Sequence, residues 1–317
     1  MFVSEHYLLA RPLWDKTRYG IEMAARYADS LRGIDPFAPS HNVYYIGAYL
    51  RPGDYTPHVS PEGDMKVLVA RFVHALATDG RFRDLGGVGV SRFWCDEEFA
   101  RWACDVVRHY AVDGCTDDFA ESLGYSYTPG ILSNGDFMDG LAGWDARPAE
   151  TGSLVVTNLP GAAKTVFARI GAGTMGDSFA LFTRSASRPN ILSRKVSGLV
   201  PGRLYSLNYA TVDYDEMLKP GVHSTNMAFN AKISNACLVE NGSYASFWPP
   251  LEWAAVRRPQ KAAVCAHKIV FEARADEAEL TFSDWRDGSS PGGRIGERLI
   301  MNNAGIRPYY KGKEKAK

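Results

Sequence analysis

The spacing of apolar residues changes near residue 130, and this change constrains the fold more than any other feature of the chain. Before it, apolar runs typical of buried strands alternate with stretches whose apolar residues recur at helical spacing. After it, short segments alternate apolar and polar residues and are separated by Gly, Pro, Asn and Ser. A chain of 317 residues is long enough for two hydrophobic cores, so we expect two domains of different class.

Three strand-then-helix units occupy the first part of the chain. Apolar runs at residues 2–8, 43–50 and 87–94 are each followed by a stretch with a helical stripe. Strands that alternate with helices imply parallel strands joined by right-handed crossovers. Three units are too few to close a barrel, and an open sheet of three strands leaves unpaired edges. We therefore expect residues 1–115 to form a partial, barrel-like α/β region and the chain to be incomplete.

The second part of the chain has the pattern of an antiparallel β-sandwich. Its alternating segments include SFALFTR at 178–184, RLYSLNYATVDY at 203–214 and HKIVFEAR at 267–274. Their spacing and the turn residues between them are typical of two packed sheets. The sequence thus predicts an all-β domain over residues 131–310, after a linker at 116–130. The ending KGKEKAK, at 311–317, is predicted to be a basic, solvated tail.

The segment NGDFMDGLAGW, at 134–144, opens this second part. An Asn-Gly-acid-Phe sequence followed by a Gly-Trp pair resembles the first strand of jelly-roll carbohydrate-binding modules. VSGLVPGRLYSLNYA at 196–210 and IMNNAGIRPYY at 300–310 fit the same family in the same order. The resemblance implies a jelly-roll sandwich and a polysaccharide or oligosaccharide partner, although related sandwiches also serve as spacers.

The resemblance also raises the question of a metal. Many such modules hold a structural calcium ion through a carboxylate in the first strand and an Asp in the last, because a hard cation takes several oxygen ligands. Met138 and Asn302 stand in those places here, with Asp136 and Asp139 nearby. We therefore expect no cofactor, and a calcium site only as the less favoured alternative.

The first part resembles, more loosely, the C-terminal portion of a glycoside hydrolase (β/α)-barrel. Such an enzyme usually cleaves glycosides with two carboxylates at the C-terminal mouth of the barrel. Glu5, near the end of the first strand, is the best single candidate for a catalytic carboxylate, and a polar lip residue is the alternative. Asp96 and Glu97 are better explained by the positive end of a helix dipole. The resemblance implies a fragment or subunit of a carbohydrate-active enzyme that is inactive alone.

Aromatic residues are concentrated at 241–258, in NGSYASFWPPLEWAAVRR. Tyr244, Phe247, Trp248 and Trp253 surround a Pro-Pro pair there. Aromatic rings held in a rigid loop can stack on the flat C–H faces of sugars. We expect these four residues to bind a carbohydrate; the alternative is that they cap the sandwich or pack on the α/β region.

Composition excludes several other functions. Lys plus Arg and Asp plus Glu number 36 each, so no basic field gathers nucleic acid. No apolar run reaches the roughly 18 residues of a membrane span, and the N-terminus lacks the pattern of a secretory signal. The five cysteines form no C-x-x-C pair, and His58, His74 and His109 lack H-E-x-x-H spacing, so packing or surface roles are expected for them.

Two function classes stay open. The first is a fragment of a glycoside hydrolase with an appended sugar-binding sandwich, and the second is a non-catalytic carbohydrate-binding or scaffold protein. The compartment is also open, with secretion of a longer parent protein as one alternative.

Overall fold

The computed structural model describes residues 2–7, 13–49, 64–93, 96–125, 131–160, 177–218, 228–248 and 264–312. It divides into two compact units. The first unit contains the described residues up to 125 together with 310–312, and the second contains those from 131 to 309.

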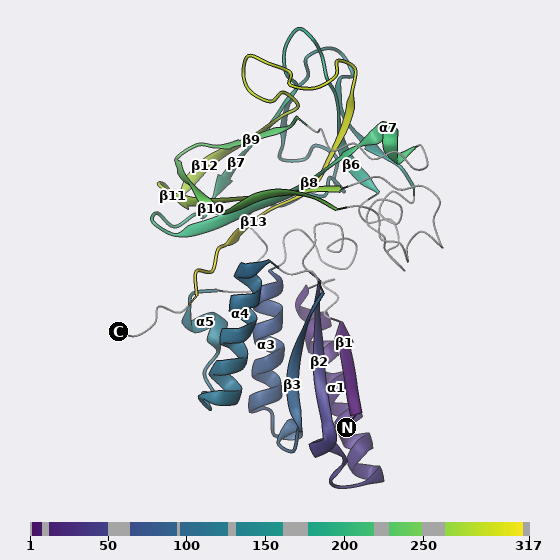
Figure 1. Ribbon diagram of the computed structural model, residues 1–317, viewed down its shortest axis with the longest axis vertical. Coiled ribbons are helices and arrows are strands. Elements are labelled where there is room, and N and C mark those ends of the chain that lie inside the picture. The colour runs from purple at the N-terminus through teal and green to yellow at the C-terminus, as the bar shows by residue number, and fades with distance from the viewer. Residues whose placement is uncertain are drawn as a thin grey trace. The chain divides into compact units, whose positions relative to one another are not determined.

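The first unit alternates strands and helices (Figure 1). Its elements are β1 (Phe2–Tyr7), α1 (Leu13–Ile34), a 3-10 helix (Ala38–His41), β2 (Asn42–Tyr49), α3 (Met65–Thr78), a 3-10 helix (Gly80–Phe82), β3 (Gly87–Phe93), α4 (Glu97–Val107), a π-helical turn (Arg108–Val112) and α5 (Phe119–Ser122). The three strands are parallel and lie in the order β1-β2-β3, which confirms the parallel pairing predicted from periodicity. A barrel is not shown, since the described residues of this unit form a single sheet of three strands.

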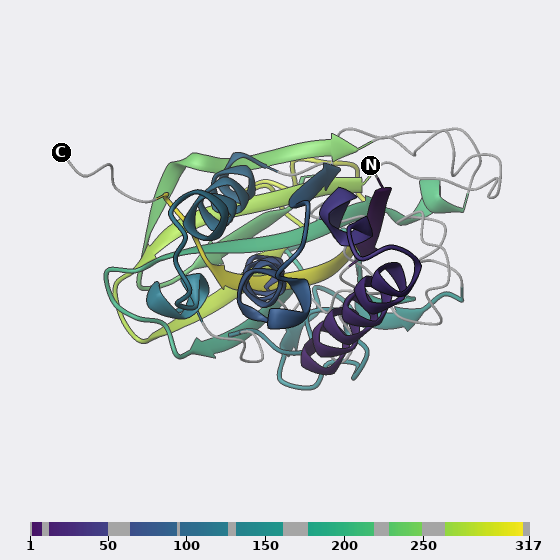
Figure 2. The ribbon, with the colours of Figure 1, turned by 90° about the horizontal axis from the view of Figure 1, so that it is seen from below.

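The crossover helices α1 and α3 lie on one side of this sheet (Figure 2), as right-handed crossovers between successive neighbouring strands require. Tyr44 and Ile46 of β2 are buried, and the Tyr44 hydroxyl donates a hydrogen bond to the carbonyl of Ala24 in α1 at 3.0 Å. Tyr45, the residue between them, is 37% exposed, and its ring lies against Gly89 of β3. One face of the sheet is thus packed under helices, and the other carries a partly exposed ring.

The segment expected to be a linker, 116–130, contains α5 in its described portion. Phe119 of α5 is fully buried, and its ring centroid lies 5.1 Å from that of Trp102 in α4. The prediction of a linker was wrong for these residues because Phe119 and Ala120 are apolar enough to join the core of the first unit. Asp96 caps α4 by accepting a hydrogen bond from the Phe99 N–H at 3.0 Å, as its position predicted.

Tyr310 also belongs to the first unit, although the sequence placed it at the end of the sandwich. Its backbone N–H donates to Glu98 Oε1 at 2.8 Å, its hydroxyl donates to Asp105 Oδ2 at 2.9 Å, and its ring lies 4.8 Å from Trp102. Glu98 pairs in turn with the buried Lys66 at 2.6 Å. Burial lowers the pKa of Lys66, but the carboxylates of Asp64 and Glu98 outweigh burial and raise this pKa above its ordinary value.

The second unit is an antiparallel sandwich of two sheets, as predicted. Its elements are β4 (Asp145–Arg147), β5 (Leu154–Asn158), β6 (Ser178–Thr183), β7 (Ile191–Ser197), β8 (Leu204–Asp213), α7 (Tyr214–Met217), β9 (Asn230–Ile233), β10 (Ala236–Trp248), β11 (Val264–Ala273), β12 (Glu277–Ser283) and β13 (Arg298–Pro308). The six-stranded sheet has the order β10-β11-β8-β13-β6-β5, and the four-stranded sheet has the order β4-β7-β12-β9. Leu192 and Phe282 from one sheet pack in a common core with Leu207 and Phe271 from the other.

A buried guanidinium joins the two sheets. Arg184, directly after β6, forms an ion pair with Glu297, which precedes β13. Its Nε also donates to the carbonyl of Asp284, directly after β12, at 2.7 Å, and its Nη2 donates to the carbonyl of Ala228 at 2.5 Å. The Asp284 carboxylate accepts hydrogen bonds from the backbone and side-chain amides of Asn190 at 2.9 and 2.6 Å. Burial lowers the pKa of Arg184, and Asp284 opposes that change.

None of the described helices is both long enough and apolar enough to cross a lipid bilayer.

Replacing Arg184 by Met is expected to lower the free energy of unfolding of the sandwich by about 3–5 kcal/mol, because the Glu297 carboxylate would stay buried without its partner. Arg147→Met is the matched control, since Arg147 pairs with Asp145 at 3.6 Å on the surface and its side chain is 61% exposed. The control variant is expected to lose no more than about 0.5 kcal/mol of its free energy of unfolding. Urea unfolding of both variants checks this, and equal losses would contradict it.

Candidate functional site

The turn at 134–144 is held by the side chain of Asn134. Its Nδ2 donates hydrogen bonds to the carbonyls of Gly140 and Ala142 at 3.1 and 3.0 Å, and its Oδ1 accepts one from the Asp139 N–H at 3.0 Å. Its backbone carbonyl accepts a hydrogen bond from Trp144 Nε1 at 3.0 Å, and its φ is +51°. An Asn tolerates this left-handed conformation better than most residues do.

The other residues of the motif are also fixed by packing. Phe137 is fully buried, and its ring lies 5.6 Å from that of Trp144. A Cβ at Gly135 would overlap the carbonyl oxygen of Ala304 in β13, whose N–H donates to the Gly135 carbonyl at 2.9 Å. Phe137 and Trp144 of the motif therefore pack in the sandwich core, and Gly135 allows the close approach of β13.

A polar hollow of about 500 Å³ lies over β7 and β12 of the four-stranded sheet. It is lined by Gly143, Asp145, Ser193, Arg194, Lys195, Ser234, Asn235, Glu277, Ala278 and Glu279. In β12 the partly exposed Glu277 and the exposed Glu279 alternate with the buried Ala278 and Leu280, so the two carboxylates lie on the outer face of the sheet. The volume falls within the range of small-molecule sites.

Charges of both signs meet in this hollow. Lys195 Nζ lies 2.7 Å from a Glu277 carboxylate oxygen. The guanidinium of Arg194 lies over the Trp144 ring at 5.6 Å and donates to the backbone carbonyl and the hydroxyl of Ser133, both at 2.7 Å. The Glu279 carboxylate makes no hydrogen bond or ion pair within the part of the chain that the structure describes. The hollow therefore offers a fixed cation and a carboxylate that can accept new hydrogen bonds.

The turn between β9 and β10 forms one rim of the hollow and is bonded to β12. Ser234 and Glu279 exchange two hydrogen bonds, from the Ser234 N–H to the Glu279 carbonyl at 3.0 Å and from the Glu279 N–H to Ser234 Oγ at 2.8 Å. Asn235 Nδ2 donates to the Glu277 carbonyl at 3.1 Å. The rim is thus attached to the same strand that carries the two carboxylates, which keeps the polar groups in a defined arrangement.

The sequence-predicted ligand residues fall on β10 rather than on a loop. Residues 244–248 pair with β11 at the edge of the six-stranded sheet, with Tyr244 opposite Lys268 and Trp248 opposite Val264. The register shifts between Val239 and Tyr244, and Gly242 has a φ of +91°. The prediction of a loop was wrong there because the Asn-Gly-Ser residues form a bulge within the strand.

The side chains of Tyr244, Phe247 and Trp248, and all of Trp253, lie outside the described residues. The same holds for the side chain of Glu5, whose backbone pairs with Tyr45 inside β1. The assignments of Glu5 to catalysis and of the four aromatic residues to ligand binding remain predictions.

Neither of the two positions compared with a calcium site carries a carboxylate. Asn302 is fully buried, and its Nδ2 donates to the Ser178 carbonyl at 3.0 Å while its Oδ1 accepts from the Asn303 N–H at 2.8 Å. Met138, at the other position, is 38% exposed. Within the described residues, a group of His, Cys, Asp or Glu side chains close enough for one ion occurs at His109, Cys115 and Asp117, in the first unit.

Sequence reasoning missed the hollow. Its signal was present in EAELTFS, at 277–283, where acidic residues alternate with apolar ones, and in the polar Ser-Arg-Lys at 193–195. Each segment alone is typical of an ordinary solvated strand face. Only the pairing of β7 with β12 and the return of the β9–β10 turn bring these residues together.

Comparison with known proteins gives weak structural matches. No protein-family model and no curated protein matches the chain. TmCBM61 in complex with β-1,4-galactotriose matches with 12% identity over 57% of this chain and 99% of that chain, at a TM-score of 0.28. A CBM4 structure matches with 10% identity over 56% and 99% of the two chains, at 0.28. The enzymatically active domain of bacteriophage CBA120 tailspike protein 4 matches with 12% identity over 56% and 21%, at 0.32. Similarities this weak assign no ligand to this chain.

Two substitutions at Asn134 separate its backbone role from its side-chain role. Asn134→Gly keeps the positive φ but loses three side-chain hydrogen bonds, so we expect a loss of about 2 kcal/mol in the free energy of unfolding. Asn134→Ala loses the same hydrogen bonds and also places an alanine side chain at a positive φ. We expect this strain to lower the free energy of unfolding by about 1 kcal/mol more. Chemical denaturation checks both, and an alanine variant more stable than the glycine variant would contradict the assignment.

Proposed function

We propose that the sandwich, residues 131–309, is a non-catalytic carbohydrate-binding module whose ligand binds in the hollow over β7 and β12. The observation that carries this proposal is the convergence of Asp145, Lys195, Glu277, Glu279 and Asn235 on one concave surface. A sugar hydroxyl both donates and accepts hydrogen bonds. Carboxylates accept, an ammonium donates and a side-chain amide does both, so this set matches adjacent hydroxyls of a neutral sugar.

The rigidity of the hollow supports the same proposal. The β9–β10 turn is bonded to β12, and Arg194 is fixed against Ser133 and Trp144. Groups that are already ordered lose little conformational freedom when a ligand binds. Mobile, solvated charges would bind neutral sugars more weakly, because a ligand would have to order them.

The aromatic residues of β10 form a second candidate site on the same unit. Tyr244, Phe247, Trp248 and Trp253 would act by stacking on sugar rings, as the sequence resemblance implies. β10 begins at Ala236, directly after Asn235 in the hollow. Tyr244 and Trp248 lie opposite Lys268 and Val264, while Ala236 lies opposite Ala273. At the rise of a strand along β11, residues 244–248 are therefore roughly 17–30 Å from Ala236. The two candidate sites are therefore separate, and substitutions in one leave the other intact.

The hydrolase alternative assumes that the parallel strands β1, β2 and β3 belong to a barrel, whereas the described residues form a single three-stranded sheet there. It requires two carboxylates in a shared site, and Asp96, which follows β3, is engaged in capping α4. The proposed function assigns no catalytic residue to the first unit, and Glu5 is kept as the position to test.

Binding is tested with the full chain against a panel of soluble polysaccharides, by affinity electrophoresis followed by calorimetry. Glu279→Gln is expected to weaken binding roughly tenfold, because a hydrogen bond to a charged acceptor is lost. Glu240→Gln, an exposed acid on β10, is the matched control and should bind unchanged.

The outcomes distinguish the two sites. Loss of binding in Trp248→Ala or Trp253→Ala, with Glu279→Gln unaffected, would assign the ligand to the aromatic segment and reject the hollow. Failure of the folded protein to bind any polysaccharide of the panel would contradict the proposed function itself.

A separate prediction concerns catalysis. The purified chain is expected to release little or no product from chromogenic glycosides, since three strands cannot position two carboxylates around a substrate as a barrel does. Turnover above the uncatalysed rate that Glu5→Gln abolishes would contradict this and identify Glu5 as a catalytic residue.

A further inference from the structure

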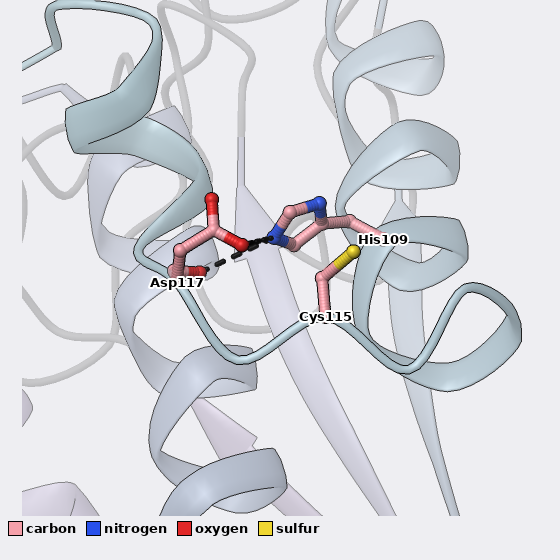
Figure 3. Close-up of side chains that lie close together, drawn as sticks. All are labelled: His109, Cys115 and Asp117. Atoms are coloured by element: carbon pink, nitrogen blue, oxygen red, sulfur yellow. Dashed lines mark hydrogen bonds and ion pairs between the residues drawn. The ribbon is translucent and has the colours of Figure 1, made fainter.

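Three side chains with metal-binding atoms meet after α4, in the first unit. These are His109 in the π-helical turn and Cys115 and Asp117 in the loop that follows (Figure 3). One ligand atom from each lies within 4.8 Å of the other two. They come from elements different from those of the sugar-binding proposal, so the two inferences are independent.

The backbone brings the three residues together over a short stretch of chain. The π-helical turn ends with a hydrogen bond from the Asp113 N–H to the Arg108 carbonyl at 2.9 Å, and Gly114 follows with a φ of +66°. This left-handed residue reverses the chain, and the Cys115 N–H then donates to the His109 carbonyl at 3.0 Å. A π turn frequently marks a functional site, because it places side chains where a regular helix would not.

Tyr110 holds the rest of the loop in place. Its hydroxyl donates to the Asp117 carbonyl at 3.1 Å and accepts from the Phe119 N–H at 2.9 Å. The His109 ring lies between Tyr110 and Phe119, with centroid distances of 4.7 and 5.2 Å. The imidazole and the aspartate are therefore positioned by interactions that do not depend on a metal.

The separation of two of the ligand atoms fits a small tetrahedral ion. His109 Nε2 and Asp117 Oδ1 are 3.3 Å apart. Two ligands at about 2.0–2.1 Å from a tetrahedral zinc ion are separated by about that distance. A thiolate with an imidazole and a carboxylate is a donor set that zinc accepts and that calcium and magnesium do not favour.

His109 is buried, and one of its two ring nitrogens is bonded within the described residues. The residue is 5% exposed, and its Nε2 lies 3.2 Å from the Asp117 carbonyl oxygen, a contact that an ion at Nε2 would replace. Its Nδ1 has no hydrogen-bond partner among the described protein atoms. Buried histidines that serve packing alone usually have their ring nitrogens bonded. Asp117, in contrast, has a side chain that is 63% exposed, so an ion could enter from that side.

We propose that His109 Nε2, Cys115 Sγ and an Asp117 carboxylate oxygen bind one zinc-class divalent cation. Three protein ligands leave a fourth position for water, which is the arrangement of an open rather than a closed zinc site. This site departs from the expectation from sequence that the chain binds no metal. The spacing H-x5-C-x-D follows neither the helical nor the paired-cysteine patterns by which metal sites are recognised.

The test uses tag-free full chain with a reductant that contains no thiol, and the probes are Zn²⁺ and Co²⁺ alone. One equivalent of Co²⁺ is expected to give the near-ultraviolet charge-transfer absorption of a cobalt–thiolate bond, and Zn²⁺ should abolish it by displacement. Cys115→Ser is expected to remove this absorption and to weaken Zn²⁺ binding at least about tenfold. Asp117→Asn should weaken binding while the absorption remains; because this side chain is exposed, the variant is expected to fold as the parent does.

The controls match each ligand by chemistry. Cys104→Ser removes an exposed thiol of α4, and Asp113→Asn removes an exposed carboxylate of the same loop. Both are expected to bind Zn²⁺ as the parent does, and circular dichroism without metal checks that all variants are folded. The proposal is overturned if the folded parent shows no cobalt–thiolate absorption, or if Cys115→Ser and Asp117→Asn keep the affinity of the parent.

Discussion

The sandwich depends on one buried cation, the guanidinium of Arg184. It follows β6 in the six-stranded sheet, and it reaches Asp284 at the end of β12 and Glu297 ahead of β13. A charge removed from water must have its full set of partners, so the three chain segments have to come together in one arrangement. Asp284 extends this constraint to Asn190 at the start of β7. Both sheets are thereby fixed to each other at one place by polar contacts and elsewhere by the apolar core.

That arrangement has consequences for the hollow. Asn190 directly precedes β7, and β7 carries Ser193, Arg194 and Lys195 into the hollow. Asp284 directly follows β12, which carries Glu277 and Glu279. The two strands that supply most of the polar lining are thus the two strands whose ends the buried network fixes. The register places Glu279 opposite Lys195, and the Lys195 ammonium pairs with Glu277 two residues away on the same strand as Glu279.

The sequence predicted the elements whose residues obey a single period. Ser178–Thr183, Leu204–Asp213 and Glu277–Ser283 alternate with little interruption, and the structure has strands at all three. β10 was missed because Asn-Gly-Ser at 241–243 is typical of a turn, while in the structure Gly242 lies in a bulge that the neighbouring strand tolerates. The burial of Arg184 could not be foreseen from its neighbours in the sequence, because its partners are more than 40 positions away. Long-range pairing of this kind leaves no local signal.

The place of Tyr310 affects the order in which the protein can fold. The chain leaves the first unit after residue 125, forms the sandwich, and returns to complete the first unit with a ring on Trp102 and hydrogen bonds to Glu98 and Asp105. A ribosome synthesises the N-terminal residues first, and domains usually fold as they emerge. Here the earlier unit lacks its last packing residue until the whole sandwich has been made. The α/β unit can therefore complete its core only after the sandwich that follows it has been synthesised.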